Sequence, residues 1–305
     1  MFSERGMLGM STDHDRLFKE LISTFFEEFI MLFFPEAFEH LDFENLRFLS
    51  QELFTDVTEG DKHVVDLLVE TKLKGEDGLV IIHLEPQSSS QKKFNERMFI
   101  YFSRIYQKYR RKILPIAIFT YDTTRDEPDS LTLHFPFADI LQFNYLIVEL
   151  KKQNWRSYIR EDNPVAAALL SKMGYTKEER VEVKKEFFRI LIRLELDTAR
   201  EALLTGFFES YLKLNAQEES QLIKEVKAMN PKEGEKIMEI MTSYERKGIK
   251  QGLEQGIEQG REQERLEVAK RMLEKEKSID EIIEITGLSG IVVEKLKKEF
   301  PSRKQ

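Results

Sequence analysis

The chain contains no cysteine among its 305 residues, so disulfide bonds and thiolate metal sites are excluded. This composition is typical of proteins of the reducing cytoplasm. The most apolar run, FIMLFF at 29–34, is too short to span a bilayer and is followed by Pro35. The first residues lack the basic, apolar and small-residue order of a signal peptide. We therefore expect a soluble cytoplasmic protein with no membrane partner.

Apolar and charged residues are both plentiful. The hydrophobic fraction of 41% and the 23 phenylalanines suffice for a folded core, which excludes global disorder. A length of 305 residues favours two or three folding units over one. The formal net charge is -8, but overall acidity does not exclude a nucleic-acid partner, since a local basic face would decide that.

The first part of the chain shows helix and strand patterns in the order of a mixed α/β domain, which we place at 11–150. A helix is expected to begin at a cap within 11–13 and to end at Pro35, because apolar residues recur between them at helical spacing. Strands are expected at 46–54, 62–71, 79–85, 113–121, 131–135 and 143–150, with a further helix at 92–110. The fold class is therefore α/β, with a mixed sheet flanked by helices.

The rest of the chain is expected to be all-α. Residues 151–245 carry apolar positions at helical spacing, as at 197–214, and form a predicted helical domain with breaks at Gly174 and Asn230-Pro231. Residues 246–305 combine a glycine repeat with a small helical tail, in which Ser278 to Glu281 is a capping box. The tail has the shape of a helix-turn-helix, which would bind DNA, but simple helical hairpins share this pattern and both interpretations stay open.

The glycine repeat at 248–263 reads GIKQ, GLEQ, GIEQ, GREQ, with a period of four residues. On a helix its glycines form one stripe, although each interior glycine costs roughly 0.5–1 kcal/mol relative to alanine. Such a stripe would let a second helix approach closely, as in a homo-oligomer formed through the C-terminal helix. A flexible polar spacer is the alternative. A membrane helix is excluded by the many charged residues and glutamines.

Two acidic residues and a glutamine mark a candidate site on the hairpin formed by 62–71 and 79–85. If Glu76 and Asp77 centre its turn, paired residue numbers sum to 153, and Asp66 and Glu85 become diagonal neighbours on one face, roughly 5–8 Å apart. A slip by two residues keeps them on that face. Gln87 shares the face of Glu85.

Two carboxylates on one sheet face repel each other, and a divalent cation would compensate them. Mg²⁺ or Mn²⁺ suits such oxygen ligands, and the carbonyl of Pro86 is a candidate third ligand. The alternative is a solvated face on which Lys or Arg partners the acids. His83 also lies on this face, as a candidate contact to metal or water or, in the plainer interpretation, as a hydrogen-bonded sheet histidine.

The segments around these residues resemble a known family. Asp66 followed by Glu85-Pro86-Gln87 is similar to the PD-(D/E)XK nuclease signature. The stretch HLEPQSSSQKKFNERMFIYFSRIYQKYRRKILPIAIFTYD at 83–122, HDRLFKELI at 14–22 and the glycine repeat resemble the recombination-promoting nuclease (Rpn) and putative transposase family. The resemblance implies a PD-(D/E)XK nuclease-like core and metal-assisted hydrolysis of phosphodiester bonds in DNA, linked to recombination or mobile elements.

The resemblance also implies roles for single residues. Asp66 and Glu85 match the metal-binding acidic pair, and Glu20 matches a further acid on the first helix, with Asp15 as its competitor. Gln87 stands where the wider superfamily usually carries lysine, so it orients by hydrogen bonds and brings no charge. Lys92 or Lys93 is a candidate for supplying that charge.

The segment 92–112 carries eight basic residues and one acid, a charge of +7 in 21 residues. This density beside the predicted metal site suits a phosphate backbone. Its interleaved aromatic residues are expected to pack in the core. The candidate DNA contacts are Lys92, Lys93, Arg97, Arg104 and Lys108. We therefore expect a metal-dependent DNA endonuclease; the alternatives are a DNA-binding or oligomerising accessory protein that cleaves weakly, and a regulator acting through its tail.

Overall fold

The computed structural model describes residues 4–49, 67–73, 76–85, 93–124 and 126–299. The chain divides into two compact units, residues 1–238 and 239–305, which are treated separately below. The predicted domain boundaries after residues 150 and 245 stay predictions. No helix in the described ranges is both long and apolar enough to cross a membrane.

Three helices precede the sheet: α1 (Glu4–Thr24), α2 (Phe26–Phe33) and α3 (Pro35–Phe38). The expected start of the first helix within 11–13 is wrong, because α1 already begins at Glu4. Pro35 follows α2 as expected, and it opens α3, where its missing N–H costs nothing. The apolar residues of these helices are core residues, namely Phe18, Leu21, Ile22, Phe25, Phe26, Phe29 and Ile30.

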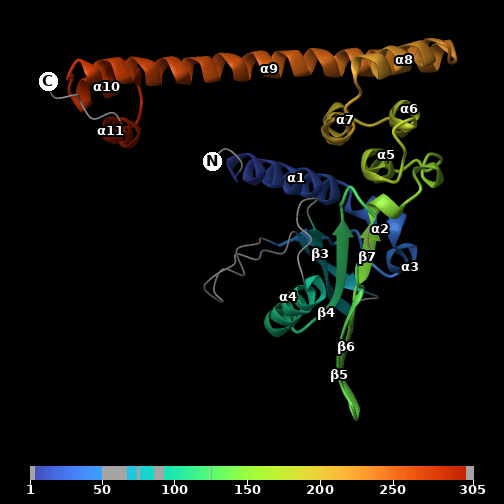
Figure 1. The fold of residues 1–305 in the computed structure, drawn as a ribbon. Coiled ribbons are helices and arrows are strands. Elements are labelled where there is room, and N and C mark those ends of the chain that lie inside the picture. Colours follow the sequence, from blue (N-terminus) through green and yellow to red (C-terminus); the bar gives the residue numbers. More distant parts are fainter. Residues whose placement is uncertain (1–3, 50–66, 74–75, 86–92, 125, 300–305) are drawn as a thin grey trace. The chain divides into compact units, whose positions relative to one another are not determined.

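A five-stranded sheet follows in the order β1-β2-β3-β4-β7 (Figure 1). Its strands are β1 (Arg47–Phe48), β2 (Leu67–Leu73), β3 (Glu76–Glu85), β4 (Lys112–Phe119) and β7 (Leu146–Glu149). The first three pair antiparallel, whereas β3, β4 and β7 run parallel. Helix α4 (Phe94–Tyr109) makes the crossover between β3 and β4. The mixed α/β class and the order of helix, strands, helix and strand are confirmed.

The register of the β2–β3 hairpin differs from the expected one. Paired residue numbers sum to 149, as in Leu67 with Ile82, so Leu68 faces Ile81 and not Glu85. The supposed turn is part of β3, because Asp77 pairs with Lys72 and Glu76 with Leu73. The shift from 153 is an even number, so each residue of β3 keeps its expected face.

A second, two-stranded sheet consists of β5 (Ser130–Phe135) and β6 (Ala138–Asn144). We call it the ribbon; in Figure 1 it extends away from the main sheet. The strand expected at 143–150 is therefore split, since its first two residues belong to β6 and 146–149 form β7. The split follows from packing: Phe143 turns toward α4 and joins the ribbon, whereas Val148 is buried in the main sheet.

Short helices fill the rest of the first unit: α5 (Pro164–Leu169), α6 (Arg180–Leu194), α7 (Thr198–Tyr211) and α8 (Ala216–Lys227), with 3-10 turns at 150–152, 155–157 and 170–172. Local residues cap α5, α7 and α8, as where Asp197 accepts hydrogen bonds from two backbone N–H groups at the start of α7. The helix expected at 197–214 is confirmed, although it ends at Tyr211. Its Phe208 stacks on Phe187 of α6, with ring centroids 4.1 Å apart.

Helix α9 (Pro231–Glu274) begins in the first unit and continues into the second. It passes through the glycine repeat without a break, so the repeat is helical and not an irregular spacer. In the second unit α10 (Ile279–Thr286) and α11 (Gly290–Glu299) follow, and the capping box at Ser278 is confirmed. Gly287 ends α10 at a φ of 66°, which favours glycine. Buried Ala269, Ile282 and Val293 hold the three helical segments of this unit together.

Gly174 and Gly206 form a matched pair for a stability test. A Cβ on Gly174 would lie 2.6 Å from the carbonyl oxygen of Lys151, so Gly174→Ala should destabilise the protein by ~1–3 kcal/mol. A Cβ on Gly206, inside α7, would meet nothing within 4 Å, so Gly206→Ala should stabilise it by about 0.5–1 kcal/mol. Urea unfolding measures both, and equal effects would contradict the close approach at Gly174.

Candidate active site

The carboxyl ends of three parallel strands meet at one edge of the main sheet. Glu85, the last residue of β3, is level with Phe119 at the end of β4, and Phe119 is level with Glu149 at the end of β7. Neighbouring strands lie ~4.8 Å apart, so about 10 Å separates the backbones of Glu85 and Glu149. We call this place the sheet edge. The backbone of one predicted metal ligand, Glu85, therefore lies where three strands end.

Several predicted site residues lie outside the described ranges: Asp66, Pro86, Gln87 and Lys92. The side chain of Glu85 is likewise not described. Within the described residues no group of three or more His, Asp or Glu side chains is arranged to hold a metal ion. The metal site thus stays a prediction. Its predicted ligand atoms, carboxylate and carbonyl oxygens, are of the type that Mg²⁺ or Mn²⁺ prefers.

A buried histidine attaches α1 to the sheet edge. The Nε2 atom of His14 lies 2.9 Å from Oγ1 of Thr120, the residue after β4. Its Nδ1 atom lies 2.8 Å from the hydroxyl oxygen of Tyr211, at the end of α7. His14 and Thr120 are both buried. In the sequence, His14 is the first residue of the stretch 14–22 that resembles the family. No local pattern there indicates a contact with Thr120 or Tyr211.

The structure distinguishes the two candidate acids of α1, Asp15 and Glu20. Asp15 is the neighbour of His14 in the chain, and Oδ1 of Asp15 is buried. Glu20 lies five residues farther along, about 7.5 Å by helical rise. Its side chain is 51% exposed and faces the guanidinium of Arg16 at 3.9 Å. Asp15 thus has a buried carboxylate oxygen next to the residue that contacts the sheet edge, whereas Glu20 is exposed.

A buried lysine reaches the loop that follows β4. Its ammonium nitrogen lies 3.1 Å from Oδ1 of Asp122, and the Lys172 side chain is only 3% exposed. The same ammonium lies 5.1 Å from the ring centroid of Tyr211. Burial lowers the pKa of Lys172, and the charge of Asp122 opposes that effect. Sequence reasoning missed this cation, because Lys172 follows the apolar run AAALLS without a charged neighbour.

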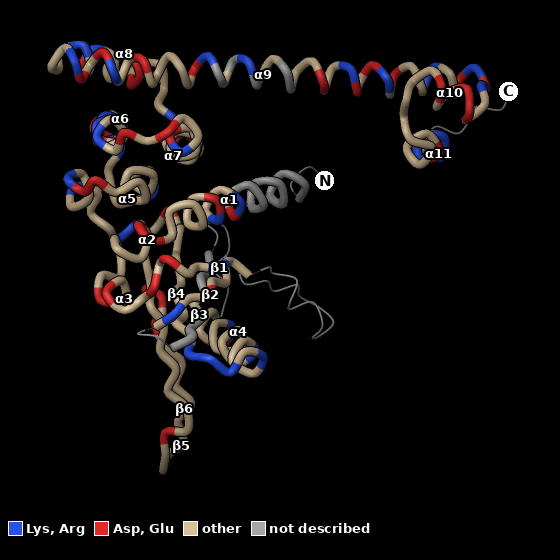
Figure 2. The backbone as a smooth tube through the Cα atoms, turned by 180° about the vertical axis from the view of Figure 1, so that it is seen from behind, with Lys and Arg blue, Asp and Glu red and all other residues tan. Residues whose placement is uncertain are grey.

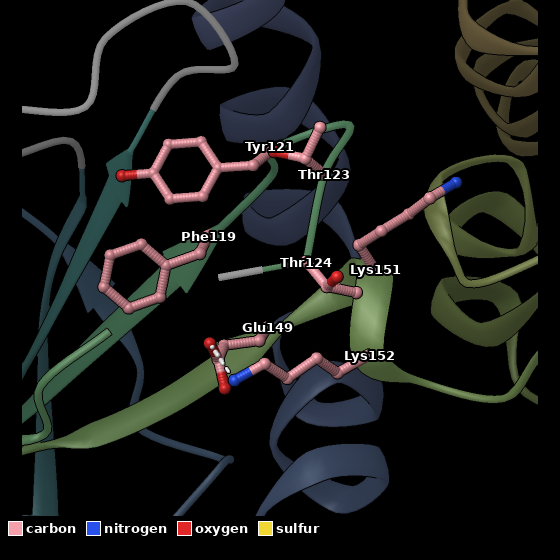
Figure 3. Close-up of a pocket in the computed structure, with 7 residues that line it drawn as sticks. All are labelled: Phe119, Tyr121, Thr123, Thr124, Glu149, Lys151 and Lys152. Carbon is pink, nitrogen blue, oxygen red and sulfur yellow. Dashed lines mark ion pairs between the residues drawn. The ribbon is translucent and has the colours of Figure 1, made fainter. Parts of the chain in front are cut away.

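A small cavity opens between the ends of β4 and β7 (Figure 3). Its lining consists of Phe119, Tyr121, Thr123, Thr124, Glu149, Lys151 and Lys152. A volume of about 10 Å³ holds at most one water molecule, so no nucleotide fits there. Lys152 lies 2.8 Å from Glu149 and 2.8 Å from Asp126. Hydrogen bonds to Asp126 and then Glu149 raise the pKa of Lys152, so Glu149 is an ion-paired acid and not an open ligand.

Helix α4 presents some of the predicted DNA contacts to solvent. Lys93 and Lys108 are exposed, and Lys93 pairs with Glu96 at 3.2 Å. Arg104 is half-buried. Arg97 lies against the ring of Phe94, with its guanidinium carbon 5.2 Å from the ring centroid. The exposed cations of α4 are therefore fewer than the sequence suggested.

The aromatic residues of α4 mostly pack inward, as expected. Phe94 and Tyr101 are buried, and Phe99 and Phe102 pack against a core cluster. Tyr106 is the exception, because it is exposed and its ring is parallel to that of Phe102, with centroids 6.2 Å apart. The helix thus binds the sheet through one face and leaves a partly basic face outward.

The lowered pKa of Lys172 predicts a dependence of stability on pH. The unfolded chain has the ordinary lysine pKa of 10.5, above the folded value, so between the two values the unfolded state binds more protons and stability rises with pH. Relative to Lys172→Met, the wild type should gain about 1.4 kcal/mol for each unit by which the pKa is lowered.

Unfolding free energies of the wild type and Lys172→Met between about pH 7 and 10.5 test this expectation. Lys172→Arg is the control, because arginine stays charged throughout and its difference from Lys172→Met should not change with pH. A wild-type difference that is equally constant would show that burial does not lower this pKa.

Comparison with known proteins places these features in a family. The family model described as "Putative transposase, YhgA-like" matches residues 12–201, more than half of the chain. The matched region includes the main sheet, α4, His14 and Lys172, and it ends within α7 before Tyr211. No curated protein matches the chain. No solved structure matches it either. The resemblance to the Rpn and putative transposase family is thereby confirmed, and the chain belongs to the YhgA-like family of putative transposases.

Proposed function

We propose that this protein is a metal-dependent DNA endonuclease of the PD-(D/E)XK type, acting in the cytoplasm and linked to recombination or mobile elements. The observation that carries the proposal is the sheet edge. There the end of β3 at Glu85 is one strand away from Thr120, which the α1 residue His14 contacts at 2.9 Å. Membership of a family of putative transposases supports DNA as the substrate.

In this proposal Asp66 and Glu85, with the carbonyl oxygen of Pro86, hold Mg²⁺ or Mn²⁺. The bound ion supplies Lewis-acid stabilisation of the phosphate and lowers the pKa of the attacking water. Gln87 orients water or phosphate by hydrogen bonds and adds no charge. The geometry of α1 favours Asp15 over Glu20 as the third acid, since Asp15 follows His14 and Glu20 faces solvent beside Arg16.

The exposed face of α4 is the proposed track for the DNA backbone. Lys93 and Lys108 project from this helix, and Arg104 is half-buried between them. Because α4 leads directly from the segment after β3, a phosphate near Glu85 would continue along it. These contacts are to phosphate and carry no sequence information, so they favour cleavage with little sequence preference.

The second candidate is a DNA-binding or oligomerising accessory protein that cleaves weakly or not at all. The ion pair of Glu149 with Lys152 favours it, since that acid is already neutralised. The helical glycine repeat also favours it, because Cβ atoms on Gly248, Gly256 and Gly260 would meet nothing within 4 Å, which leaves room for a second α9. DNA binding by α10 and α11 remains a third, regulatory proposal.

Cleavage of plasmid DNA in Mg²⁺ or Mn²⁺ tests the metal site. Asp66→Ala and Glu85→Gln should each lower the rate by about 100-fold or more, because each removes a metal ligand. Asp15→Asn should lower it as well, whereas Glu20→Gln and the ion-paired control Glu149→Gln should not. Cleavage that survives both Asp66→Ala and Glu85→Gln would refute the metal site, and binding without cleavage in either metal would favour the accessory protein.

DNA affinity as a function of salt tests the role of α4. Lys93→Ala and Lys108→Ala should each weaken binding for all sequences and reduce the slope of log K against log salt by about 0.9. Lys227→Ala is the control, since this lysine is exposed on α8 of the same unit. An unchanged slope for both α4 variants, or an equal change for Lys227→Ala, would remove α4 from the DNA interface.

A further inference from the structure

The ribbon has one apolar face that runs from a buried base to an exposed tip. At the base, Leu131 pairs with Phe143, and both are buried. The ring of Phe143 packs on α4, with centroids 5.4 Å from Phe99 and 5.0 Å from Phe102. Leu133, one pair farther out on the same face, is already half exposed. The core cluster beneath α4 therefore continues outward along the ribbon as uncovered apolar surface.

The tip of the ribbon exposes large apolar side chains. Phe137 is 84% exposed, the highest value for any large hydrophobic residue in the described ranges, and Ile140 is 61% exposed. Phe135 is half exposed, and its ring lies 5.6 Å from that of Phe137. A two-stranded ribbon is at best marginally stable in water without a layer packed on it. An apolar tip of this kind is typical of an interaction surface.

The ribbon offers no cation to an anionic occupant. From Ser130 to Asn144 the sequence contains one acid, Asp139, and no Lys or Arg. Figure 2 accordingly shows no basic residue along β5 and β6. The one histidine, His134, pairs with Asp139 at 2.6 Å. A DNA backbone or an anionic bilayer would find no cation on the ribbon, which favours a protein surface as the partner.

We propose that the apolar face of the ribbon packs against the same face of a second copy of this chain. A two-fold interface brings each patch against itself, so it tolerates apolar residues at its centre and penalises unpaired charge. The ribbon meets this condition, because its only charged residue between Ser130 and Asn144 is Asp139, beside His134.

The available area also suits a dimer. A large apolar side chain has on the order of 150–200 Å² of surface, so at their exposed fractions Leu133, Phe135, Phe137 and Ile140 together offer roughly 400 Å² per copy. That is about half of the ~800 Å² per partner of a standard interface, which suits a weak or transient dimer. This surface is distinct from the sheet edge and from the glycines of α9. The proposed dimer contact therefore does not depend on nuclease activity.

Cysteine cross-linking tests this contact directly, since the chain has no cysteine of its own. Ile140→Cys places one thiol on the ribbon and leaves Phe135 and Phe137 in place. Ile285→Cys, on α10, is the control for random collisions, because Ile285 is 65% exposed against 61% for Ile140. Under mild oxidation of the full chain, Ile140→Cys should give at least ~10-fold more covalent dimer than the control, which corresponds to a preference of ~1.4 kcal/mol.

A double variant tests whether the apolar tip causes the cross-linking. Phe137→Asp added to Ile140→Cys should reduce the yield to that of Ile285→Cys. Without any cysteine, Phe137→Asp should weaken self-association by at least ~10-fold in sedimentation, whereas Leu253→Asp, at a 63% exposed position of α9, should not. Circular dichroism checks that the Phe137→Asp chain is folded, and Ile140→Asp replaces it if it is not.

Three results would overturn the proposal. The first is an equal cross-linking yield for Ile140→Cys and Ile285→Cys. The second is self-association that is lost in Leu253→Asp and kept in Phe137→Asp, which would assign the contact to α9. The third is a monomeric wild type in which Phe137→Asp lowers DNA affinity, which would indicate that the tip inserts between DNA bases.

Discussion

Two contacts of one buried histidine hold together three segments that are far apart in the chain. His14 of α1 lies 2.9 Å from Thr120 after β4 and 2.8 Å from Tyr211 at the end of α7. Phe18, one turn farther along α1, packs on Phe207 with centroids 4.9 Å apart. The helical layer therefore fixes α1 against the sheet edge. The proposed active site depends on that placement, because it brings α1 to the end of β4, the strand next to β3.

Charge is distributed unevenly over the first unit, and the distribution separates its surfaces. Cations gather on α4, whereas the ribbon that packs on the same helix has no Lys or Arg and a single acid, Asp139, among its apolar and uncharged polar residues. At the sheet edge, Lys152 forms ion pairs with both Glu149 and Asp126, and the buried Lys172 forms one with Asp122. Nucleic acid and a second copy would thus meet different faces of one domain, and neither would compete for the other's charges.

Strong local patterns predicted the elements well, and pairing was predicted less well. The helix at 92–110 and the strand at 113–121 were found as α4 and β4, because apolar periodicity specifies the type of element directly. The β2–β3 register was wrong by four, since Glu76, Asp77 and Gly78 look like a turn locally but pair as a strand. The segment 143–150 was read as one strand, because nothing local shows that Phe143 packs on α4 and Val148 in the sheet.

The sequence by itself determined the α/β class, the helical C-terminal half, the family and the basic character of α4, because composition, periodicity and local motifs need no knowledge of contacts. Only the tertiary structure decided that His14 lies at the end of β4, that Oδ1 of Asp15 is buried while Glu20 is exposed, and that Lys172 is buried beside Asp122. It also decided that the ribbon leaves an apolar tip uncovered. These features depend on which segments meet, and contacts between residues that are far apart in the chain, such as His14 with Thr120 or Lys172 with Asp122, leave no pattern in one sequence.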